Sequence, residues 1–431
     1  MSRIAVIGTG YVGLTTGAYL AHIGHQVVCA DVVEEKVARL SRGDIPIFEV
    51  GLEELVRGGL DSGRLHFVLG SERAVAGAEF VFLCLPTPQG EDGAADLSYI
   101  QAEAERLGPL LESGSVVINK STVPVGSTRM VQRSLGRGDV AVVSNPEFLR
   151  EGSAVHDCLN PDRIVIGSDD AAEASRVAAL YERIHAPILV TDPPSAELIK
   201  YASNAFLATK ISYVNAIANL CEVVGADVRE VVMGMGYDKR IGFEFLRPGP
   251  GWGGSCFPKD TRALVRIAED AGYDFGLLEG VIAVNVEQYS RIADKIQGAV
   301  AGGVLDGRTV AVWGLTFKAL TDDIRDSPAL EVIHHLRARG AQVRAFDPMV
   351  DRRRAAGDDR LAGITLCDEP YQACEEADVV VVLTEWDEFR WLDFGKVKEL
   401  LAAPVVVDCR NLLDPAAMRR RGFAYHGVGR S

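Results

Sequence analysis

Short runs rich in Val and Ile alternate with helical patterns in two separate parts of this chain. In about the first 190 residues the runs are "RIAVIG", "HQVVCAD", "FVFLCLPTP", "SVVINKSTVP", "VAVVSNPEF", "RIVIGS" and "PILVTD". From about residue 308 they are "RTVAVWG", "AQVRAFDP", "DVVVVLTEW" and "PVVVDCR". Continuous apolar strands with helices between them indicate a parallel sheet that is covered on both faces. We therefore expect an α/β protein with two doubly wound, Rossmann-like domains.

A helical segment separates the two parts. Residues 196–224 contain neither Gly nor Pro, and Gly225 follows as a C-cap. This pattern predicts one helix of about 29 residues, about 43 Å long, which suits a spine between domains or a dimer interface. We expect three domains, over residues 1–195, 196–303 and 304–431, with the long helix at the start of the middle one.

Composition restricts the possible partners. The net charge of −15 argues against a nucleic-acid or anionic membrane surface, although a few local cations can still hold a small phosphate ligand. The 8 cysteines form no C-x-x-C pair and no grouping with His, so we expect neither disulfides nor a metal site, and a reducing cytoplasm. The apolar runs are too short to span a bilayer, and "MSRIAVIGTGYVG" leads into a strand rather than a signal peptide.

The first strand is followed by a glycine pattern that is typical of dinucleotide binding. "IAVIGTGYVG" contains Gly8, Gly10 and Gly13, and Asp31 ends the next strand, 23 residues after Gly8. Such glycines let the backbone approach a pyrophosphate, and the acidic side chain accepts from a ribose 2′-hydroxyl. Asp31 would repel a 2′-phosphate, so the pattern favours NAD over NADP. A glycine-rich turn without a ligand is the alternative.

The second α/β part lacks this pattern. "VAVWGLTFK" has one glycine after its strand, followed by Lys318, and Arg325 lies in "TDDIRDSP". We therefore expect this part to bind something other than a complete dinucleotide. Exposed salt bridges are the alternative explanation for either cation.

One cysteine has an unusual setting. In "GGSCFPKDTRAL", Pro258 suits a first helical turn, which places Cys256 just before a positive helix end. Gly253 and Gly254 would leave room for a ligand. Lys259 is unfavourable in a first turn, which suggests that it has a ligand partner. Spacing alone does not separate a catalytic cysteine from a buried, inert one.

Two further pairs of polar residues are four positions apart. Lys200 and Asn204 share one face of the long helix, and because an unpaired buried ammonium is costly, we expect them to face a polar cleft. Glu147 and Glu151 follow a predicted strand, where ligands of parallel sheets bind. A solvated stripe on the helix and solvated carboxylates are the respective alternatives.

Together these segments resemble the nucleotide-sugar dehydrogenase family, whose members oxidise a sugar C6 alcohol to a carboxylate. The resemblance covers nearly the whole chain, through "GTGYVG", "PTP", "STVPVGST", "NPEFLREG", "ELIKYASNAFLATKISYVNAIANLCE", "GGSCFPKD", "GLTFKALTDDIRDSP" and "TEWDEF". Within the family, "YASNAFLATKIS", "GADV" and "TEWDEF" look most like the members that act on UDP-glucose.

The resemblance implies that UDP-glucose, two NAD⁺ and water give UDP-glucuronate and two NADH. Cys256 would hold the substrate as a thiohemiacetal and then as a thioester, which water hydrolyses. Lys200 and Asn204 would stabilise the developing oxyanion, Asp260 would orient or activate water, and Glu147 and Thr122 would assist proton transfer. Whether Lys200 or a water held by Asp260 takes the first proton stays open.

The resemblance also assigns binding residues. The cofactor would contact the three glycines and Val12, Asp31, Lys36, Thr87, Thr122, Glu151, Lys259 and Arg325. The substrate would contact Glu147, Phe148, Leu149, Arg150, Glu151, Lys200, Asn204, Phe245, Leu246, Arg247, Pro248, Gly249, Gly253, Lys318 and Arg410, and Arg240, which could reach a neighbouring subunit. Residues 1–195 would thus bind NAD, 196–303 would carry the cysteine and the dimer contact, and 304–431 would bind the UDP group. The family implies a homodimer or a larger homo-oligomer.

Three positions depart from the family pattern. Val50 replaces a proline, Trp252 stands where Phe or Tyr is common, so that stacking beside the sugar nucleotide could differ, and Cys409 replaces a glycine beside Arg410. Three other functions compete with the expected one. They are a GDP-mannose dehydrogenase with the same chemistry, a hydroxyacid dehydrogenase that needs no cysteine, and a non-catalytic binding protein.

Overall fold

The computed structural model describes residues 1–90, 93–351 and 357–430. It divides into two compact units. Unit 1 comprises Met1–Ser203 and Arg262–Tyr273, and unit 2 comprises Asn204–Thr261 and Asp274–Ser431. Two helices, α9 (Pro193–Val224) and α11 (Phe257–Asp270), contribute residues to both units. The domain boundaries that the sequence suggested at residues 195 and 303 stay predictions.

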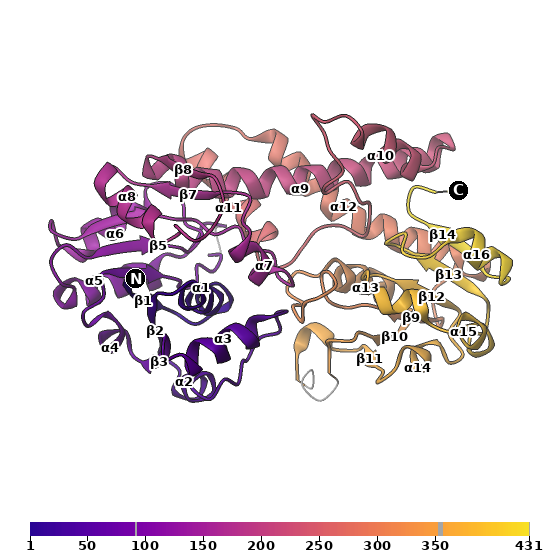
Figure 1. Cartoon of the computed structure of the whole chain (residues 1–431). Helices are drawn as coiled ribbons and strands as arrows, with labels where there is room; N and C mark the ends of the chain where they lie inside the picture. The colour runs from indigo at the N-terminus through magenta and orange to yellow at the C-terminus, as the bar shows by residue number, and fades with distance from the viewer. Residues whose placement is uncertain (91–92, 352–356, 431) are drawn as a thin grey trace. The chain divides into compact units, whose positions relative to one another are not determined.

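Unit 1 is built on an eight-stranded sheet in the order β3-β2-β1-β4-β5-β6-β7-β8 (Figure 1). Its strands are β1 (Arg3–Ile7), β2 (Gln26–Asp31), β3 (Leu65–Leu69), β4 (Phe80–Leu83), β5 (Val116–Asn119), β6 (Ala141–Ser144), β7 (Ile164–Gly167) and β8 (Ile188–Thr191). Its shorter helices are α1 (Tyr11–His22), α2 (Glu34–Leu40), α3 (Leu52–Asp61), α4 (Ser71–Val75), α5 (Ser98–Leu107), α6 (Ser127–Leu135), α7 (Ala154–Leu159) and α8 (Ala171–Ala179), with the 3₁₀ turn η1 (Gly108–Leu110).

Unit 2 contains a six-stranded parallel sheet in the order β11-β10-β9-β12-β13-β14. Its strands are β9 (Thr309–Trp313), β10 (Gln342–Phe346), β11 (Thr365–Leu366), β12 (Val379–Val382), β13 (Val405–Asp408) and β14 (Ala424–Gly427). Its other helices are α10 (Val228–Gly236), α12 (Gly276–Ala299), α13 (Pro328–Ala338), α14 (Pro370–Cys374), α15 (Phe394–Leu400) and α16 (Pro415–Arg420), with the 3₁₀ turns η2 (Ala301–Gly303), η3 (Asp359–Leu361) and η4 (Asp387–Trp391).

Both faces of each sheet are covered, as the continuous apolar runs predict. In β1, Ile4 and Val6 belong to one buried cluster, whereas Ala5 and Ile7 belong to another. The same split occurs in β9, where Val310 and Val312 pack on one side and Ala311 and Trp313 on the other. Because successive strand residues point to opposite faces, these clusters lie on the two faces of each sheet. The doubly wound fold class is confirmed.

The sheets differ from the sequence prediction in detail. The strands β3, β11 and β14 have no counterpart among the predicted runs, because they are short or alternate buried and exposed residues rather than forming continuous apolar runs. In unit 1, β6 and β7 pair in antiparallel direction at Ser144 and Gly167, so the sheet is not parallel at this point.

The long helix α9 is confirmed, with one adjustment at its start. It begins at Pro193, three residues before the predicted start, because proline is compatible with the first turn of a helix. It ends at Val224, and Gly225 adopts a φ of 77°, the left-handed conformation that terminates many helices. None of the helices in the described ranges is long and apolar enough to cross a membrane.

Candidate active site

The glycine-rich turn of unit 1 contains glycines that serve two different purposes. A Cβ on Gly13 would lie 1.9 Å from the carbonyl oxygen of Gly8, and a Cβ on Gly8 would lie 2.5 Å from that of Cys84. These two glycines are therefore required by the packing of α1 on the sheet. A Cβ on Gly10 would meet no described atom within 4 Å, and Gly10 caps α1 without a side-chain hydrogen bond. The first-turn N–H groups of α1 thus have open space beside them, which fits a pyrophosphate.

Asp31 lies at the carboxyl end of β2, next to this turn. Its carboxylate accepts hydrogen bonds from the Thr9 backbone N–H at 3.1 Å and from Lys36 Nζ at 2.9 Å. Burial by itself raises the pKa of Asp31, but the hydrogen bonds from Thr9 and Lys36 lower it to about 2. The carboxylate is therefore negative at neutral pH, as an acceptor for ribose hydroxyls requires.

Other predicted cofactor residues of unit 1 follow the carboxyl ends of strands. Thr87 comes after β4, Thr122 after β5 and Glu151 after β6, whereas Val12 lies in the first turn of α1. Thr87 is buried, and the other three are partly exposed. Because ligands of open α/β sheets bind at this edge, their placement fits a cofactor site.

A buried ion pair connects the segment after β6 to α9 in unit 1. Lys200 Nζ lies 2.9 Å from Glu147 Oε1, and the two side chains are 4% and 6% exposed. Burial raises the pKa of Glu147, but the Lys200 ammonium and the Leu149 backbone N–H outweigh it, so the pKa lies below its usual value. Neither side chain is solvated. This contradicts the two alternative interpretations of the sequence, a solvated stripe on the helix at Lys200 and a solvated carboxylate at Glu147.

The neighbouring residues of the "NPEFLREG" segment vary in exposure. Phe148 and Leu149 are half-buried, and Lys200 Nζ lies 5.5 Å from the centre of the Phe148 ring. Arg150 is exposed and forms an ion pair with Asp157 at 2.5 Å. Within unit 1 the structure thus brings Lys200 together with Glu147 and Phe148, while Arg150 has a local partner.

In unit 2 the predicted catalytic residues gather around Asp260. Asn204 Nδ2 donates to Asp260 Oδ2 at 2.6 Å, and Lys259 Nζ lies 2.6 Å from Oδ1. Asp260 is fully buried. The sequence suggested that Lys259 has a ligand as its partner. In this structure Lys259 pairs with the carboxylate of Asp260.

Cys256 lies one turn before Asp260, at the start of α11. Its carbonyl oxygen accepts from the Asp260 backbone N–H at 2.8 Å, and its Sγ lies 3.6 Å from Ser255 Oγ. Of the 8 cysteines, 6 are buried, whereas Cys256 and Cys367 are partly exposed. The buried interpretation of Cys256 therefore does not hold, and a thiol just ahead of a helix N-terminus is placed where the dipole favours a thiolate.

The glycines before this cysteine do not leave room for a ligand in the way the sequence suggested. A Cβ on Gly253 would lie 1.9 Å from the carbonyl oxygen of Asp326, and a Cβ on Gly254 would lie 2.8 Å from the Phe317 ring. The space beside both glycines is taken by unit 2 itself. Trp252 is also directed inward: it is buried, and its indole N–H donates to Ser212 Oγ at 2.9 Å.

The "FLRPG" loop meets Arg410 in unit 2. A Cβ on Gly249 would lie 3.2 Å from Arg410 Nη1, and the Gly249 N–H donates to Asn215 Oδ1 at 2.8 Å. Arg410 donates to the carbonyl oxygens of Leu383 and Phe317 at 2.8 and 3.1 Å. Two residues that depart from the family pattern differ in exposure. Cys409, next to Arg410, is buried, whereas Val50 in unit 1 is exposed.

The remaining residues of this loop are mixed in burial. Leu246 is buried, Phe245 and Pro248 are half-buried, and Arg247 is exposed. Phe245 has a φ of 62°, unusual for a residue with a side chain.

The other predicted cations of unit 2 have local surroundings. Arg325 and Arg240 are exposed and pair with Asp323 and Asp238, each at 2.6 Å. Lys318 is partly exposed, with its Nζ 5.4 Å from the Phe317 ring.

In unit 2, Asp347 takes the position in the sheet that Asp31 takes in unit 1, but it has a different role. Asp347 follows β10 as Asp31 ends β2, but it is buried and its Oδ2 accepts from the N–H groups of Leu315 and Thr316 at 2.7 and 3.0 Å. The Trp386 indole N–H donates to the same oxygen. Because Asp347 holds its own loop, it has little capacity for a ribose, which supports a ligand other than a complete dinucleotide.

Sequence reasoning missed several buried polar residues near these groups. Lys120 follows β5, Asn145 follows β6, and Asn215 of α9 holds the "FLRPG" loop. Within the described residues, Asn215 Nδ2 has no hydrogen-bond partner. A polar side chain directly after an apolar strand is the signal that could have drawn attention to the first two.

Three family models match the chain in order along its length. They describe the UDP-glucose/GDP-mannose dehydrogenase family: its NAD binding domain matches residues 2–185, its central domain residues 194–287, and its UDP binding domain residues 311–415.

Individual relatives match over the full length. The chain is 46% identical to UDP-glucose 6-dehydrogenase TuaD of Bacillus subtilis (strain 168), over 100% of this chain and 94% of that protein. It is 47% identical to a UDP-glucose 6-dehydrogenase of Pseudomonas aeruginosa, over 99% and 97% respectively. Among solved structures, a UDP-glucose dehydrogenase from the hyperthermophilic archaeon Pyrobaculum islandicum is 40% identical, with a TM-score of 0.90 and coverage of 100% of this chain and 98% of that one.

Proposed function

The chain belongs to the UDP-glucose/GDP-mannose dehydrogenase family, and we propose that it oxidises C6 of UDP-glucose to the carboxylate of UDP-glucuronate with two NAD⁺. The full-length identity to UDP-glucose 6-dehydrogenases carries this proposal. The partly exposed Cys256 at the start of α11 supports its four-electron chemistry. In this proposal the protein is an enzyme of nucleotide-sugar metabolism.

Bound NAD⁺ would supply the hydride acceptor for each of the two oxidations at C6. The turn at Gly10 and the N-terminus of α1 would hold its pyrophosphate, and Asp31 would accept from a ribose hydroxyl. Lys36, held by Asp31, would position that carboxylate. Val12, Thr87, Thr122 and Glu151 in unit 1, and Lys259 and Arg325 in unit 2, remain proposed cofactor contacts.

The cysteine would make the second oxidation possible. After the first hydride leaves, Cys256 Sγ adds to the C6 aldehyde, and the thiol proton goes to the aldehyde oxygen. Loss of the second hydride and of that proton gives a thioester. Water then adds to C6, the C–S bond breaks, and the sulfur regains a proton while the product leaves as a carboxylate. Without this anchor, the second oxidation would require a hydrated free aldehyde.

The predicted polar catalytic residues would serve the proton and charge movements. Lys200 and Asn204 would stabilise the oxyanion that develops at the C6 oxygen. Asp260, which holds the Asn204 amide, would orient or activate water, and Glu147 and Thr122 would assist proton transfer. Either Lys200 or a water held by Asp260 would take the first proton.

Proposed contacts of the UDP-sugar are found in each unit. In unit 2 these are the loop Phe245–Gly249, Gly253, Lys318 and Arg410, with Arg240 contributed to a neighbouring subunit, and in unit 1 the segment Glu147–Glu151. Arg410 supplies a cation beside Gly249, which suits a diphosphate.

We also propose a homodimer that forms through α9. Phe206, Tyr213 and Leu220 follow one another at intervals of seven residues and are 65%, 52% and 53% exposed. Residues seven apart share one helix face, so these side chains form an apolar stripe that a second copy would cover. None of the cysteines in the described residues forms a disulfide, which suits a reducing cytoplasm, where we propose that the enzyme works.

The test counts NADH per sugar nucleotide. We expect turnover of UDP-glucose with two NADH per substrate. A preference for GDP-mannose would overturn the assignment of UDP-glucose as the substrate. A value of one NADH would refute the thioester route in favour of a hydroxyacid-type oxidation. Cys256→Ser should abolish turnover and keep UDP-glucose binding, whereas Cys367→Ser, which changes the other partly exposed cysteine, should stay active. A Cys256→Ser variant with unchanged turnover would rule out nucleophilic catalysis at this position.

A further inference from the structure

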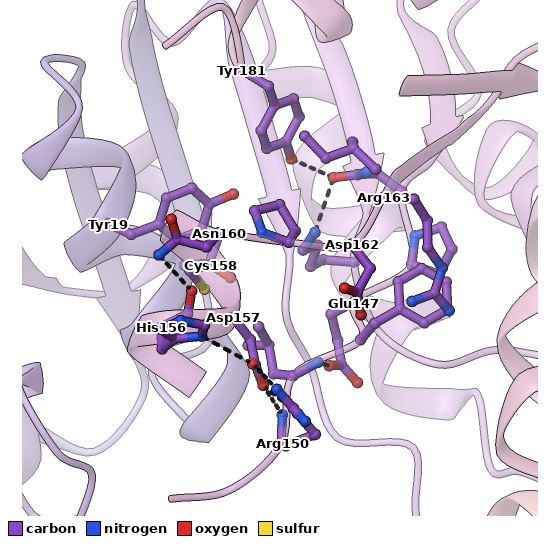
Figure 2. A pocket seen from close by; sticks show the side chains of 18 residues that line it. Tyr19, Glu147, Arg150, His156, Asp157, Cys158, Asn160, Asp162, Arg163 and Tyr181 are labelled. Atoms are coloured by element: carbon purple, nitrogen blue, oxygen red, sulfur yellow. Dashed lines mark hydrogen bonds and ion pairs between the residues drawn. The ribbon is translucent and has the colours of Figure 1, made fainter. Parts of the chain in front are cut away.

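A cavity in unit 1 reaches the buried side of the "NPEFLREG" segment. Its volume is about 120 Å³, and it extends between the segments that follow β5 and β6, α1, α7 and the start of β7 (Figure 2). Some of the lining residues are buried, namely Lys120, Asn145, Glu147 and Tyr19. Three others, His156, Asn160 and Asp162, are exposed. The cavity therefore connects buried polar groups with the surface of unit 1.

Lys120 is the buried cation of this cavity. The residue is 7% exposed, and among the described residues its Nζ has one protein acceptor, Asn145 Oδ1 at 3.1 Å. The same oxygen accepts from the Tyr181 hydroxyl at 2.5 Å. An ammonium has three N–H donors, and leaving two of them without acceptors in a buried site is costly. Because one water needs only about 10–15 Å³ of such space, the cavity can hold the waters that satisfy them.

Glu147 lines the same cavity. One oxygen contacts Lys200 Nζ, and the other accepts from the Leu149 backbone N–H at 2.6 Å. The positive charges of Lys200 and Lys120 both lower the pKa of the Glu147 carboxyl, against the effect of burial. Lys120 thus acts on Glu147 electrostatically from the cavity side, while Lys200 does so from α9.

Further charged or titratable groups line the cavity beyond these. From α1 it is Tyr19; from α7 they are His156, Asp157 and Cys158; from the segment before β7 they are Asp162 and Arg163. Asp157 is paired with Arg150, and Arg163 lies 3.7 Å from the Phe148 ring centre.

The proposed reaction makes protons that must leave this region. Oxidation of an alcohol to a carboxylate by two NAD⁺ and one water transfers two hydrides and releases three protons, as the balance of atoms and charge requires. Glu147 is proposed to take part in these transfers, yet it is 6% exposed. A buried carboxylate that passes on protons in every turnover needs a path to solvent.

We propose that this cavity is a hydrated proton outlet from Glu147, in which Lys120 positions the water that links the carboxylate to the surface. A proton moves from the Glu147 carboxyl to a cavity water and on toward the exposed lining residues, so no group is oxidised or reduced. Lys120 is a positioning residue here, because it acts through water and Glu147. This inference rests on the proposed function.

The test compares Lys120→Met with Lys120→Arg and Tyr181→Phe. Met removes the charge at similar length, Arg keeps it, and Phe removes the other donor to Asn145 without changing any charge. For Lys120→Met we expect kcat to fall about ten- to hundredfold, with KM for UDP-glucose changed less than about threefold. Small buffer bases that enter the cavity should restore part of this loss. Lys120→Arg and Tyr181→Phe should stay within about threefold of wild type at every buffer concentration.

The pH profile separates this role from a structural one. Loss of a nearby positive charge raises the pKa of a carboxyl, so the acid limb of kcat should move to higher pH by about 0.5–1 unit in Lys120→Met and not in Lys120→Arg. A uniform loss of kcat without a pH shift or buffer rescue would overturn the outlet, as would a large rise in KM, which would make Lys120 a substrate ligand. The wild type is assayed first: if it does not oxidise UDP-glucose, the proposed function fails, and if it does while Lys120→Met is fully active, only the outlet fails.

Discussion

The buried pair between Lys200 and Glu147 leads to a quantitative prediction about stability. Their Nζ and Oε1 atoms are 2.9 Å apart with both side chains almost fully buried. Removing one partner of such a pair leaves an uncompensated buried charge, which costs about 3–5 kcal/mol. For a unit of roughly two hundred residues, 1 kcal/mol corresponds to about 2–4 °C in Tm. Lys200→Met and Glu147→Gln should therefore each lower the Tm of the transition that includes unit 1 by about 6–20 °C.

The double variant and the pH dependence test the cause. Lys200→Met combined with Glu147→Gln removes both charges and should lose far less than the sum of the single changes, because a buried pair contributes little against uncharged groups of similar size. In wild type the pKa of Glu147 is lowered, so its contribution is present above the unfolded value near 4.3 and is lost as pH falls through the folded value. In Lys200→Met burial is no longer opposed by the ammonium and raises the pKa of Glu147, so the deficit should be smaller at about pH 5 than at about pH 7.5.

Calorimetry of the four proteins at both pH values provides the measurement. Additive losses in the double variant would show that the two residues do not interact energetically. A Lys200→Met deficit that is equal at both pH values would show that an unpaired carboxylate is not its cause.

Other variants separate folding from ligand binding. Gly13→Ala places a methyl group 1.9 Å from a backbone oxygen and should lower stability by about 1–3 kcal/mol. Gly10→Ala meets no described atom within 4 Å, so it should keep the Tm but weaken NAD⁺ binding about tenfold or more. Equal effects of the two variants on Tm would contradict this division between packing and binding. Asp31→Asn removes the charge that repels a 2′-phosphate, so the preference for NAD⁺ over NADP⁺ in kcat/KM should fall about tenfold, and an unchanged ratio would count against Asp31 as the selecting group. Gly253→Ala collides with the carbonyl oxygen of Asp326 at 1.9 Å and should destabilise unit 2 by about 1–3 kcal/mol even without substrate, as a thermal melt of the free protein would reveal.

The glycines illustrate how far the sequence alone could lead. The pattern from Gly8 to Gly13 predicted a dinucleotide turn as a group, because the spacing of glycines between a strand and a helix is local information. It could not say that Gly8 and Gly13 serve packing while Gly10 borders open space, since the atoms that approach them belong to other segments of the chain. For Gly253 the sequence suggested open space, whereas its Cβ position is filled by the carbonyl of Asp326, which is distant in sequence.

The charged residues show a similar division. Sequence spacing placed Lys200 and Asn204 on one helix face and Cys256 ahead of a helix, and both placements depend only on helical periodicity and proline chemistry. The partners of these residues depended on the folded chain: Lys200 pairs with Glu147, which is 53 positions away, and Asn204 with Asp260, which is 56 positions away. The position of Lys120 directly after an apolar strand is visible in the sequence, but its burial beside a cavity is not.

From its sequence this chain could be assigned two doubly wound sheets, a long helix that ends just before Gly225, and a dinucleotide turn, because each of these depends on the order of neighbouring residues. Only the tertiary structure decided which cation meets which carboxylate, which glycines are needed for packing, and which lysine lies beside water-sized space. Those outcomes depend on burial and on contacts between distant segments, which raise or lower the cost of a charge far more than its sequence neighbours do.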